Sequence, residues 1–304
     1  MTILTLSDYL KNTFGQKIYK IALESGCTCP NRDGTLGWGG CTFCSQGGSG
    51  EFAENLSGGE LPDAQIGAAK RRVLKKLPAG MKPEDQKFIA YFQSYTNTYG
   101  STDRLYKLYS QVLRRPDIVA LSVGTRPDCL EADKLAMLVS LNRVKPVWVE
   151  LGLQTASDVT AGRIHRGYPT SVFDKAYREL KAAHLTVVTH IILGLPGESR
   201  EDMLNTVRHL ASLQSPPDGI KIQMLNILAG SRLAVEYAAH PFPQMTMEEY
   251  CDLVVDCLRL LPEETVIHRM TGDGPRRLLI SPAWVTDKKR VINLLRRKIQ
   301  EAER

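Results

Sequence analysis

Four of the seven cysteines of this chain fall within one short stretch, and their spacing is that of residues that bind a metal. A Cys-x-x-Cys pair lets two thiolates converge on one centre. A loop rich in glycine can fold back to bring further sulfur atoms to the same place. The segment 27–48 therefore predicts a metal site, whose candidate ligands are Cys27, Cys29, Cys41 and Cys44.

Two kinds of metal centre suit these sulfur atoms. Four thiolates can close a tetrahedron around zinc, which would make the loop a structural knuckle. Three thiolates can instead hold an iron–sulfur cluster and leave one iron open to another ligand. A third interpretation, incidental buried cysteines, suits the scattered Cys129, Cys251 and Cys257 better than this dense group. The spacing alone does not choose between zinc and iron.

A second group of polar residues follows short runs with high β-propensity. The six runs, rich in Val, Ile, Leu, Tyr and Trp, lie at 17–23, 87–92, 118–123, 147–151, 186–193 and 219–227. Polar residues at their ends belong at the edge of a sheet where active sites form. Glu150 stands out because it interrupts an apolar run, and a buried carboxylate needs a partner or a ligand.

Helical patterns alternate with these runs, which predicts an α/β fold of parallel strands linked by helices. The expected helices are at 62–77, 102–115, 130–142, 171–183 and 199–213. Six such units form either an open doubly wound sheet or an incomplete barrel. After Pro243 a helix at 247–261 and a basic amphipathic helix at 287–299 predict a C-terminal extension packed on the core.

The composition places the chain among ordinary globular proteins. It has 304 residues, of which 43% are apolar and 24% charged, and this excludes a disordered or fibrous protein. Apolar stretches such as 191–193 are far shorter than the roughly 18 residues that a membrane span needs. The N-terminus has no secretory leader pattern. We therefore expect a cytoplasmic protein with no membrane contact and with reduced thiols.

The net charge of +6 is concentrated at the C-terminal end. Residues 265–304 contain ten Lys or Arg and four Asp or Glu, so the rest of the chain is formally neutral. A basic end of this kind suits contact with a polyanion such as an RNA backbone, although basic helices are also common as plain solvated surface.

The cysteine segment resembles the cluster-binding loop of radical S-adenosylmethionine (SAM) enzymes, in particular the bacterial YtqA/YhcC-like family, which is related to the elongator catalytic subunit. The similarity rests on Thr-Cys-Pro-Asn-Arg-Asp-Gly at 28–34 and Gly-Gly-Cys-Thr-Phe-Cys at 39–44. It continues at 91–99, 124–129, 150–155 and 190–198, and covers about 15–285.

The resemblance implies a partial (β/α)6 barrel in residues 1–230 and a small α+β extension in 231–304. It assigns Cys29, Cys41 and Cys44 as ligands of a [4Fe-4S] cluster and leaves Cys27 open, as a bystander, a fourth ligand or half of a zinc site. The fourth iron would bind SAM. Further SAM contacts carried over are Gln93 and Tyr95 near the methionine end, Ser122 and Arg126 deeper in the barrel, Glu150 and Gln154 near the ribose or amino group, Arg163 near the carboxylate, and Gly194 near adenine.

The same resemblance implies an activity. Reductive cleavage of SAM, with an electron donor such as flavodoxin or ferredoxin, would give a 5′-deoxyadenosyl radical that abstracts hydrogen from the substrate. The expected substrate is tRNA, whose wobble uridine would change from 5-carboxymethylaminomethyl to 5-aminomethyl. Two alternatives stay open: a radical SAM enzyme for a small metabolite or porphyrin-like molecule, and a zinc-stabilised nucleic-acid-binding module.

Overall fold

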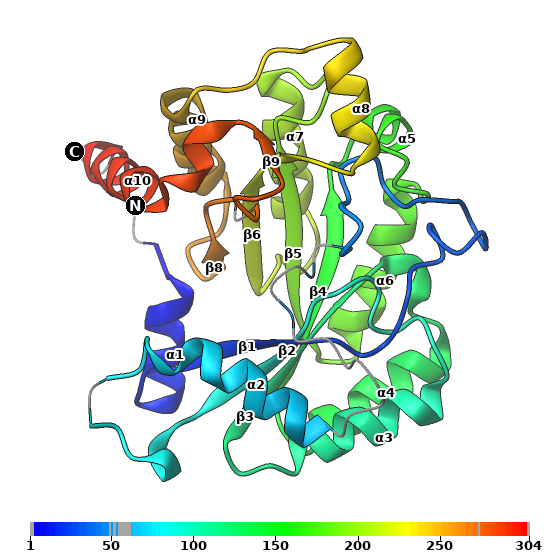
Figure 1. The fold of residues 1–304 in the computed structure, drawn as a ribbon, viewed down its shortest axis with the longest axis vertical. Helices are drawn as coiled ribbons and strands as arrows, with labels where there is room; N and C mark the ends of the chain where they lie inside the picture. The colour runs from blue at the N-terminus through cyan, green and yellow to red at the C-terminus, as the bar shows by residue number, and fades with distance from the viewer. Residues whose placement is uncertain are drawn as a thin grey trace.

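Seven parallel strands form one curled sheet that makes an open half-barrel (Figure 1). The computed structural model describes residues 3–48, 50, 53, 62–78, 80–272 and 274–302. Each strand pairs in parallel with the next along the sheet. The strands, in sheet order, are β1 (Tyr19–Leu23), β2 (Phe88–Phe92), β3 (Ile118–Thr125), β4 (Val147–Gln154), β5 (Thr186–Leu193), β6 (Gly219–Met224) and β8 (Val266–Arg269).

The predicted α/β partial barrel is confirmed, with one difference in its strands. The six predicted runs are β1 to β6, and a seventh strand, β8, extends the sheet beside β6. β8 comes from the part of the chain that was expected to form a separate extension. It has only four residues, and two of them, His268 and Arg269, are polar, so it carries too short an apolar run to be recognised.

The helices connect successive strands and cover the outside of the sheet (Figure 1). The seven expected helices are present. Three more were not expected, because they are short: α1 (Leu6–Phe14), α5 (Asp158–Arg163) and α8 (Arg232–Ala239). The expected ones are α2 (Pro62–Leu74), α3 (Thr102–Leu113), α4 (Ala132–Asn142), α6 (Thr170–Ala182), α7 (Arg200–Ala211), α9 (Met247–Leu260) and α10 (Lys288–Ala302).

The C-terminal part adds a small ribbon and two packed helices. β7 (Ile227–Leu228) pairs antiparallel with β9 (Leu279–Ser281), and a capping box of Thr246 and Glu249 begins α9. α10 buries Val291 and Leu295 and packs on α9. No helix in the described part of the chain is long and apolar enough to cross a membrane.

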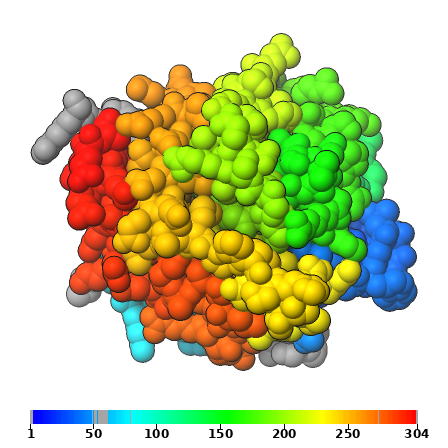
Figure 2. Space-filling view, turned by 90° about the horizontal axis from the view of Figure 1, so that it is seen from above, coloured from blue at the N-terminus to red at the C-terminus, as the bar shows by residue number. Residues whose placement is uncertain are grey.

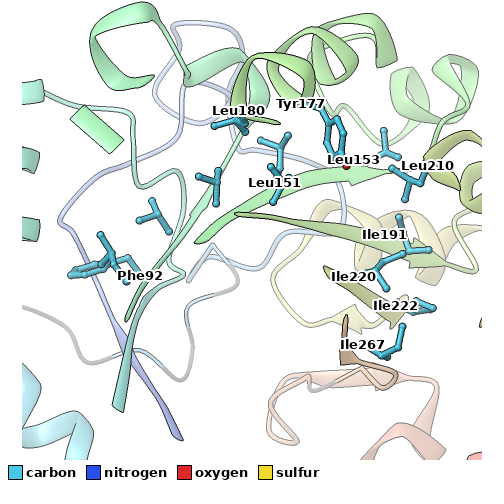
Figure 3. Close-up of a cluster of buried hydrophobic side chains, with 14 of the residues drawn as sticks. Phe92, Leu151, Leu153, Tyr177, Leu180, Ile191, Leu210, Ile220, Ile222 and Ile267 are labelled. Carbon is cyan, nitrogen blue, oxygen red and sulfur yellow. The ribbon is translucent and has the colours of Figure 1, made fainter. Parts of the chain in front are cut away.

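The main hydrophobic core lies between the sheet and its helices, and it decides which side chains face the lumen. In Figure 3, Leu151 and Leu153 of β4 lie with Tyr177 and Leu180 of α6 in this core. Successive side chains of a strand point to opposite faces, so residues 150, 152 and 154 point to the other face. Burial of the leucines therefore turns Glu150 and Gln154 into the barrel, where both line a cavity.

Candidate active site

A cavity of about 250 Å³ lies inside the half-barrel, between the cysteine loop and the inner face of the sheet. Each strand from β2 to β8 contributes lining residues, as do turns that follow them. Of the residues predicted for the site, eight line this cavity: Cys29, Cys41, Cys44, Gln93, Tyr95, Arg126, Glu150 and Gln154.

The cysteine loop follows β1 and is held against the barrel by backbone hydrogen bonds. The Thr42 amide donates to the Ile164 carbonyl at 2.9 Å, and the Cys44 amide donates to the Cys41 carbonyl at 3.0 Å. Asn31 donates through Nδ2 to the His165 carbonyl at 2.6 Å and lies 3.7 Å from the Cys41 sulfur. The three thiols of Cys29, Cys41 and Cys44 lie at the edge of the cavity.

The thiols of Cys41 and Cys44 influence each other's ionisation. A hydrogen bond from Cys44, helped by the charge of Arg126, lowers the pKa of Cys41 to about 7 against the opposing effect of burial. The same hydrogen bond, together with burial, raises the pKa of Cys44. Cys41 is therefore partly ionised at neutral pH, and the thiolate is the form that binds a metal.

Cys27 is separated from the other three cysteines. Its side chain is buried in the main hydrophobic core, and its sulfur accepts a hydrogen bond from Arg104 Nη2 at 3.0 Å. It does not line the cavity. Within the described ranges, no three His, Cys, Asp or Glu side chains are close enough to hold a single metal ion. The four sulfur atoms thus do not form the tetrahedron that a zinc knuckle requires.

Tyr95 packs against the cysteine loop and bonds to it. Its hydroxyl donates to the Gln46 carbonyl at 2.7 Å, and the Arg32 guanidinium lies 5.4 Å from its ring centre. A Cβ at Gly48 would fall 2.2 Å from the ring, and Gly48 also has a positive φ of 57°. Glycine is therefore required where the loop passes over this tyrosine.

Arg126 is held in a fixed orientation at the cavity wall. Its guanidinium makes a bidentate ion pair with Asp128, at 2.9 and 2.6 Å, and donates to the Arg166 carbonyl at 2.9 Å. Burial opposes its charge, but the Asp128 carboxylate raises the pKa of Arg126 above its ordinary value. Arg126 is therefore a permanent cation next to the thiols.

Two buried amide oxygens in the cavity wall have no hydrogen-bond partner within the described part of the chain, Gln154 Oε1 and Asn226 Oδ1. Gln154 has a positive φ of 69°, and the β4–β5 register shifts just before it. A buried acceptor without a donor is costly, so both oxygens are suited to a ligand that carries N–H or O–H groups. Asn226 was missed from the sequence because nothing in its local pattern marks it.

Glu150 is surrounded by donors from other strands. Its Oε1 accepts from Lys20 Nζ at 2.6 Å and from Ser122 Oγ at 2.6 Å. Its Oε2 lies 2.7 Å from His190 Nε2 and pairs with Lys221 Nζ. Burial opposes ionisation, but the two lysines hold the pKa of Glu150 well below its usual range. The family resemblance implied SAM contacts for Glu150 and Ser122. In the structure their polar atoms bond to each other, and Ser122 does not line the cavity.

Two predicted residues also lie outside the cavity lining. Arg163 is exposed, and its guanidinium lies over the turn after β5, where a Cβ at Gly197 would fall 2.5 Å from Nη1. Gly194 packs against Met224 and Met245. The resemblance implied Arg163 in the segment 162–168, whereas the buried residues of that segment that line the cavity are Arg166 and Tyr168. Arg166 donates to the carbonyls of Leu153 and Thr155.

The comparisons with known proteins agree with this arrangement. Residues 26–210 match the Radical SAM superfamily, and residues 217–301 match the Radical_SAM C-terminal domain. The chain is 38% identical to the uncharacterized protein YtqA of Bacillus subtilis, covering 97% of this chain and 89% of YtqA. It is 33% identical to protein YhcC of Escherichia coli, covering 92% and 86% of the two chains.

More distant relatives share a smaller part of the chain or only the fold. A tRNA uridine(34) acetyltransferase of Methanocaldococcus infernus is 24% identical over 53% of this chain and 30% of its own length. The structure of Methanocaldococcus infernus Elp3, lacking residues 1–46, aligns with a TM-score of 0.67 and 18% identity, covering 92% of this chain and 63% of that one. The second likeness is one of fold.

The chain belongs to the radical SAM superfamily, whose members are enzymes that use a [4Fe-4S] cluster and SAM. Its residues fit this pair of cofactors. Three thiols lie at the edge of one cavity. A cuboidal cluster suits this arrangement, because its three protein thiolates bind three different irons and do not surround a single metal ion. The unpartnered oxygens of Gln154 and Asn226 offer acceptors for the amino or hydroxyl groups of SAM.

Proposed function

We propose that this radical SAM enzyme modifies the wobble uridine of tRNA, converting a 5-carboxymethylaminomethyl group to 5-aminomethyl. The observation that carries the enzymatic part of the proposal is that three thiols and two unpartnered acceptors line one cavity inside the barrel. The proposal includes a cytoplasmic location and a one-electron donor such as a flavodoxin or ferredoxin.

The cysteine loop and the barrel wall have separate tasks in this scheme. Cys29, Cys41 and Cys44 would hold the cluster, and Gln154 and Asn226 would orient SAM. When bound, the cluster and SAM supply the radical chemistry that removes a hydrogen atom from the substrate. The protein positions the carboxymethyl carbon of the uridine side chain in the cavity and excludes water from it.

Features of the surface near the cavity support a nucleic-acid substrate. Trp38, at the tip of the cysteine loop, is 76% exposed, although large apolar side chains are usually covered. Its ring lies against Gly34, and Arg32 and Arg232 lie close to the same loop. An exposed aromatic ring on a loop that also carries or contacts arginines suits stacking on a base.

The basic helix α10 supports contact with the rest of the tRNA rather than with the modified base. Its outward side chains include Lys289, Arg290, Arg296 and Arg297, all exposed. Figure 2 shows α10 (red) and the cysteine loop (blue) at opposite edges of one view of the molecule. A substrate that reaches both must be extended, as an RNA backbone is. The distant match to a tRNA uridine(34) acetyltransferase adds to this support.

The test is the nucleoside composition of tRNA from a strain that lacks this gene. We expect 5-carboxymethylaminomethyluridine to accumulate and the aminomethyl product to disappear, and the wild-type gene to restore both. A gene carrying Cys29→Ala should express a stable protein and restore neither. An unchanged nucleoside profile in the deletion strain would refute the substrate assignment.

A further inference from the structure

The side-chain amide of Asn31 lies beside the sulfur of Cys41, one of the three thiols at the edge of the cavity. Its Nδ2 donates to the Cys41 Sγ across 3.7 Å. Asn31 is only 6% exposed, so water does not compete for this contact. The residue does not line the cavity, and its amide therefore reaches the sulfur from the protein side rather than from the side where SAM would bind.

A second contact fixes the orientation of this amide. Nδ2 also donates to the carbonyl oxygen of His165 at 2.6 Å. A carbonyl oxygen can only accept, so the NH2 group of Asn31, and not its Oδ1, must face it. An NH2 group carries two hydrogen atoms, and the one that His165 does not use is available to the sulfur. The hydrogen bond to Cys41 is therefore consistent with the only orientation that the His165 carbonyl accepts.

The backbone of the cysteine loop holds Asn31 and Cys41 side by side. The Asn31 carbonyl accepts from the amide of Gly40, the residue directly before Cys41, at 2.7 Å. Packing on the other side of the amide is close, because a Cβ at Gly37 would fall 2.7 Å from Asn31 Oδ1. The side chain thus has little room to turn away from the sulfur.

A hydrogen bond to this sulfur would act on the charge of the bound cluster. Cysteine binds iron as a thiolate, for which the Cys41 thiol of the structure stands, and a thiolate accepts hydrogen bonds more strongly than a thiol does. Reduction by one electron adds negative charge to the irons and to their sulfur ligands. An N–H donor stabilises this more negative state, so it raises the reduction potential, and it does so more effectively in a buried place.

We propose that Asn31 is a positioning residue that raises the reduction potential of the cluster through its hydrogen bond to the sulfur of Cys41. A one-electron donor of given strength can then reduce a larger fraction of the clusters. The proposal rests on the membership of the radical SAM superfamily and not on a tRNA substrate, so the two can fail separately.

The experiment is an anaerobic redox titration of the reconstituted full chain without SAM, in which EPR measures the reduced cluster. Asn31→Ala removes the donor. At a fixed solution potential, the ratio of reduced to oxidised cluster should fall about 10-fold, which is a reduction potential about 59 mV lower for a one-electron couple. A variant that holds a full cluster and keeps the wild-type potential would overturn the proposal.

Two further variants separate the hydrogen bond from the shape of the loop. Asn31→Asp keeps the shape of the side chain but has no N–H and adds a negative charge, so its potential should fall further than that of Asn31→Ala. Thr35→Val is the matched control, because it removes a neutral hydrogen bond of the same loop, 2.8 Å long, between Thr35 Oγ1 and Tyr99 Oη. It should change the ratio by less than about 2-fold. Equal shifts in Thr35→Val and Asn31→Ala would assign the effect to the loop as a whole and overturn the proposal.

A measurement on wild-type protein serves if the Asn31 variants do not hold a cluster. In protein with ¹⁵N in its asparagine side chains, pulsed EPR of the reduced cluster should show a hyperfine coupling to ¹⁵N. Absence of this coupling would overturn the proposal, whatever the tRNA results are. If the coupling and the lowered potential are found while the deletion strain has unchanged tRNA nucleosides, the role of Asn31 stands and the tRNA function fails.

Discussion

Glu150 shows how a charged side chain can be kept in a buried place inside the barrel. Glu150 is 1% exposed, yet it accepts hydrogen bonds from groups on four other strands. A buried carboxylate is stable only when its oxygens are satisfied in this way. Replacing Glu150 by a neutral residue would destabilise the fold, because Lys20 and Lys221 would then repel each other without a counter-charge.

His190 gives this network a pH dependence that can be measured. Burial, and then the charge of Lys221, lower the pKa of His190 from 6.5 to about 4. The unfolded chain therefore binds a proton near pH 6.5 that the folded chain does not bind until about pH 4. The free energy of unfolding should therefore fall as the pH is lowered from 6.5 to about 4, and His190 alone should account for about 3 kcal/mol of the loss.

Urea unfolding of wild-type protein and His190→Gln between pH 7 and pH 4 tests this expectation. Glutamine keeps a donor for Glu150 but has no proton to gain, so the variant should lose less stability than wild type over the window. Parallel curves for the two proteins would show that His190 does not titrate differently in the folded and unfolded states.

A functional side chain could be recognised in the sequence where a polar residue interrupts an apolar run. Glu150 was found in this way, and Lys221 carries the same signal, since it is a charged residue inside an apolar strand at 219–224. The partners of Glu150 could not be predicted, because they come from strands far apart in the sequence. Arg166 was missed because nothing local separates it from its exposed neighbour Arg163.

At the scale of elements, the cysteine loop depends on close packing as well as on its thiols. Gly48→Ala places a Cβ against the Tyr95 ring, at 2.2 Å, in a left-handed backbone conformation. Overpacking of this kind costs about 1–3 kcal/mol and should displace the end of the loop. We expect the variant to bind less iron and sulfide per chain after reconstitution.

Gly39→Ala is the matched control for this loop. Gly39 also has a positive φ, of 80°, but the nearest atom to an added Cβ, the Arg232 Cδ, is 3.8 Å away. The two variants share backbone strain and differ in the clash. Equal iron content in both would contradict the role given to the packing of Gly48 on Tyr95.

The basic helix α10 permits a second test at this scale. Replacing Lys289, Arg290, Arg296 and Arg297 by glutamine leaves the buried Val291 and Leu295 untouched. If these side chains contact phosphates, the affinity for tRNA should fall. In a plot of the logarithm of the binding constant against the logarithm of the salt concentration, the slope should become about 3 less steep. Filter binding at several salt concentrations measures both.

A matched change on another helix gives the control for α10. Glutamine at Arg71, Arg72, Lys75 and Lys76 removes the same charge from α2 and the turn after it, where these residues are also exposed. This variant should keep most of the affinity. Equal losses in the two variants would mean that tRNA responds to net charge alone and that α10 is ordinary solvated surface.

Elements with a strong pattern were predictable, and short ones were not. The six long strands and seven helices follow from apolar periodicity. The four-residue strand β8 does not, and it is positioned by its contact with β6 and by the pairing of Ile267 with Thr5. Tertiary contacts of this kind leave no mark in a local window of sequence.

The whole molecule combines the radical SAM fold with a cavity suited to a cluster and SAM. A half-barrel of seven parallel strands holds three thiols over a cavity, and a fourth thiol, Cys27, is turned into the core beside Arg104. The division of the cysteines into three and one could not be made from their spacing. It was implied by the family resemblance, and it stays a prediction.

The most direct test of the central claim is the formation of 5′-deoxyadenosine from SAM by anaerobically reconstituted protein with dithionite. Wild-type protein should produce it, and Cys29→Ala, Cys41→Ala and Cys44→Ala should each produce none and bind little iron. Cys27→Ser, which keeps an acceptor for Arg104, should remain active. A colourless wild-type protein that holds one zinc ion and forms no 5′-deoxyadenosine would contradict the account, as would a Cys27→Ser protein that folds but has lost the cluster.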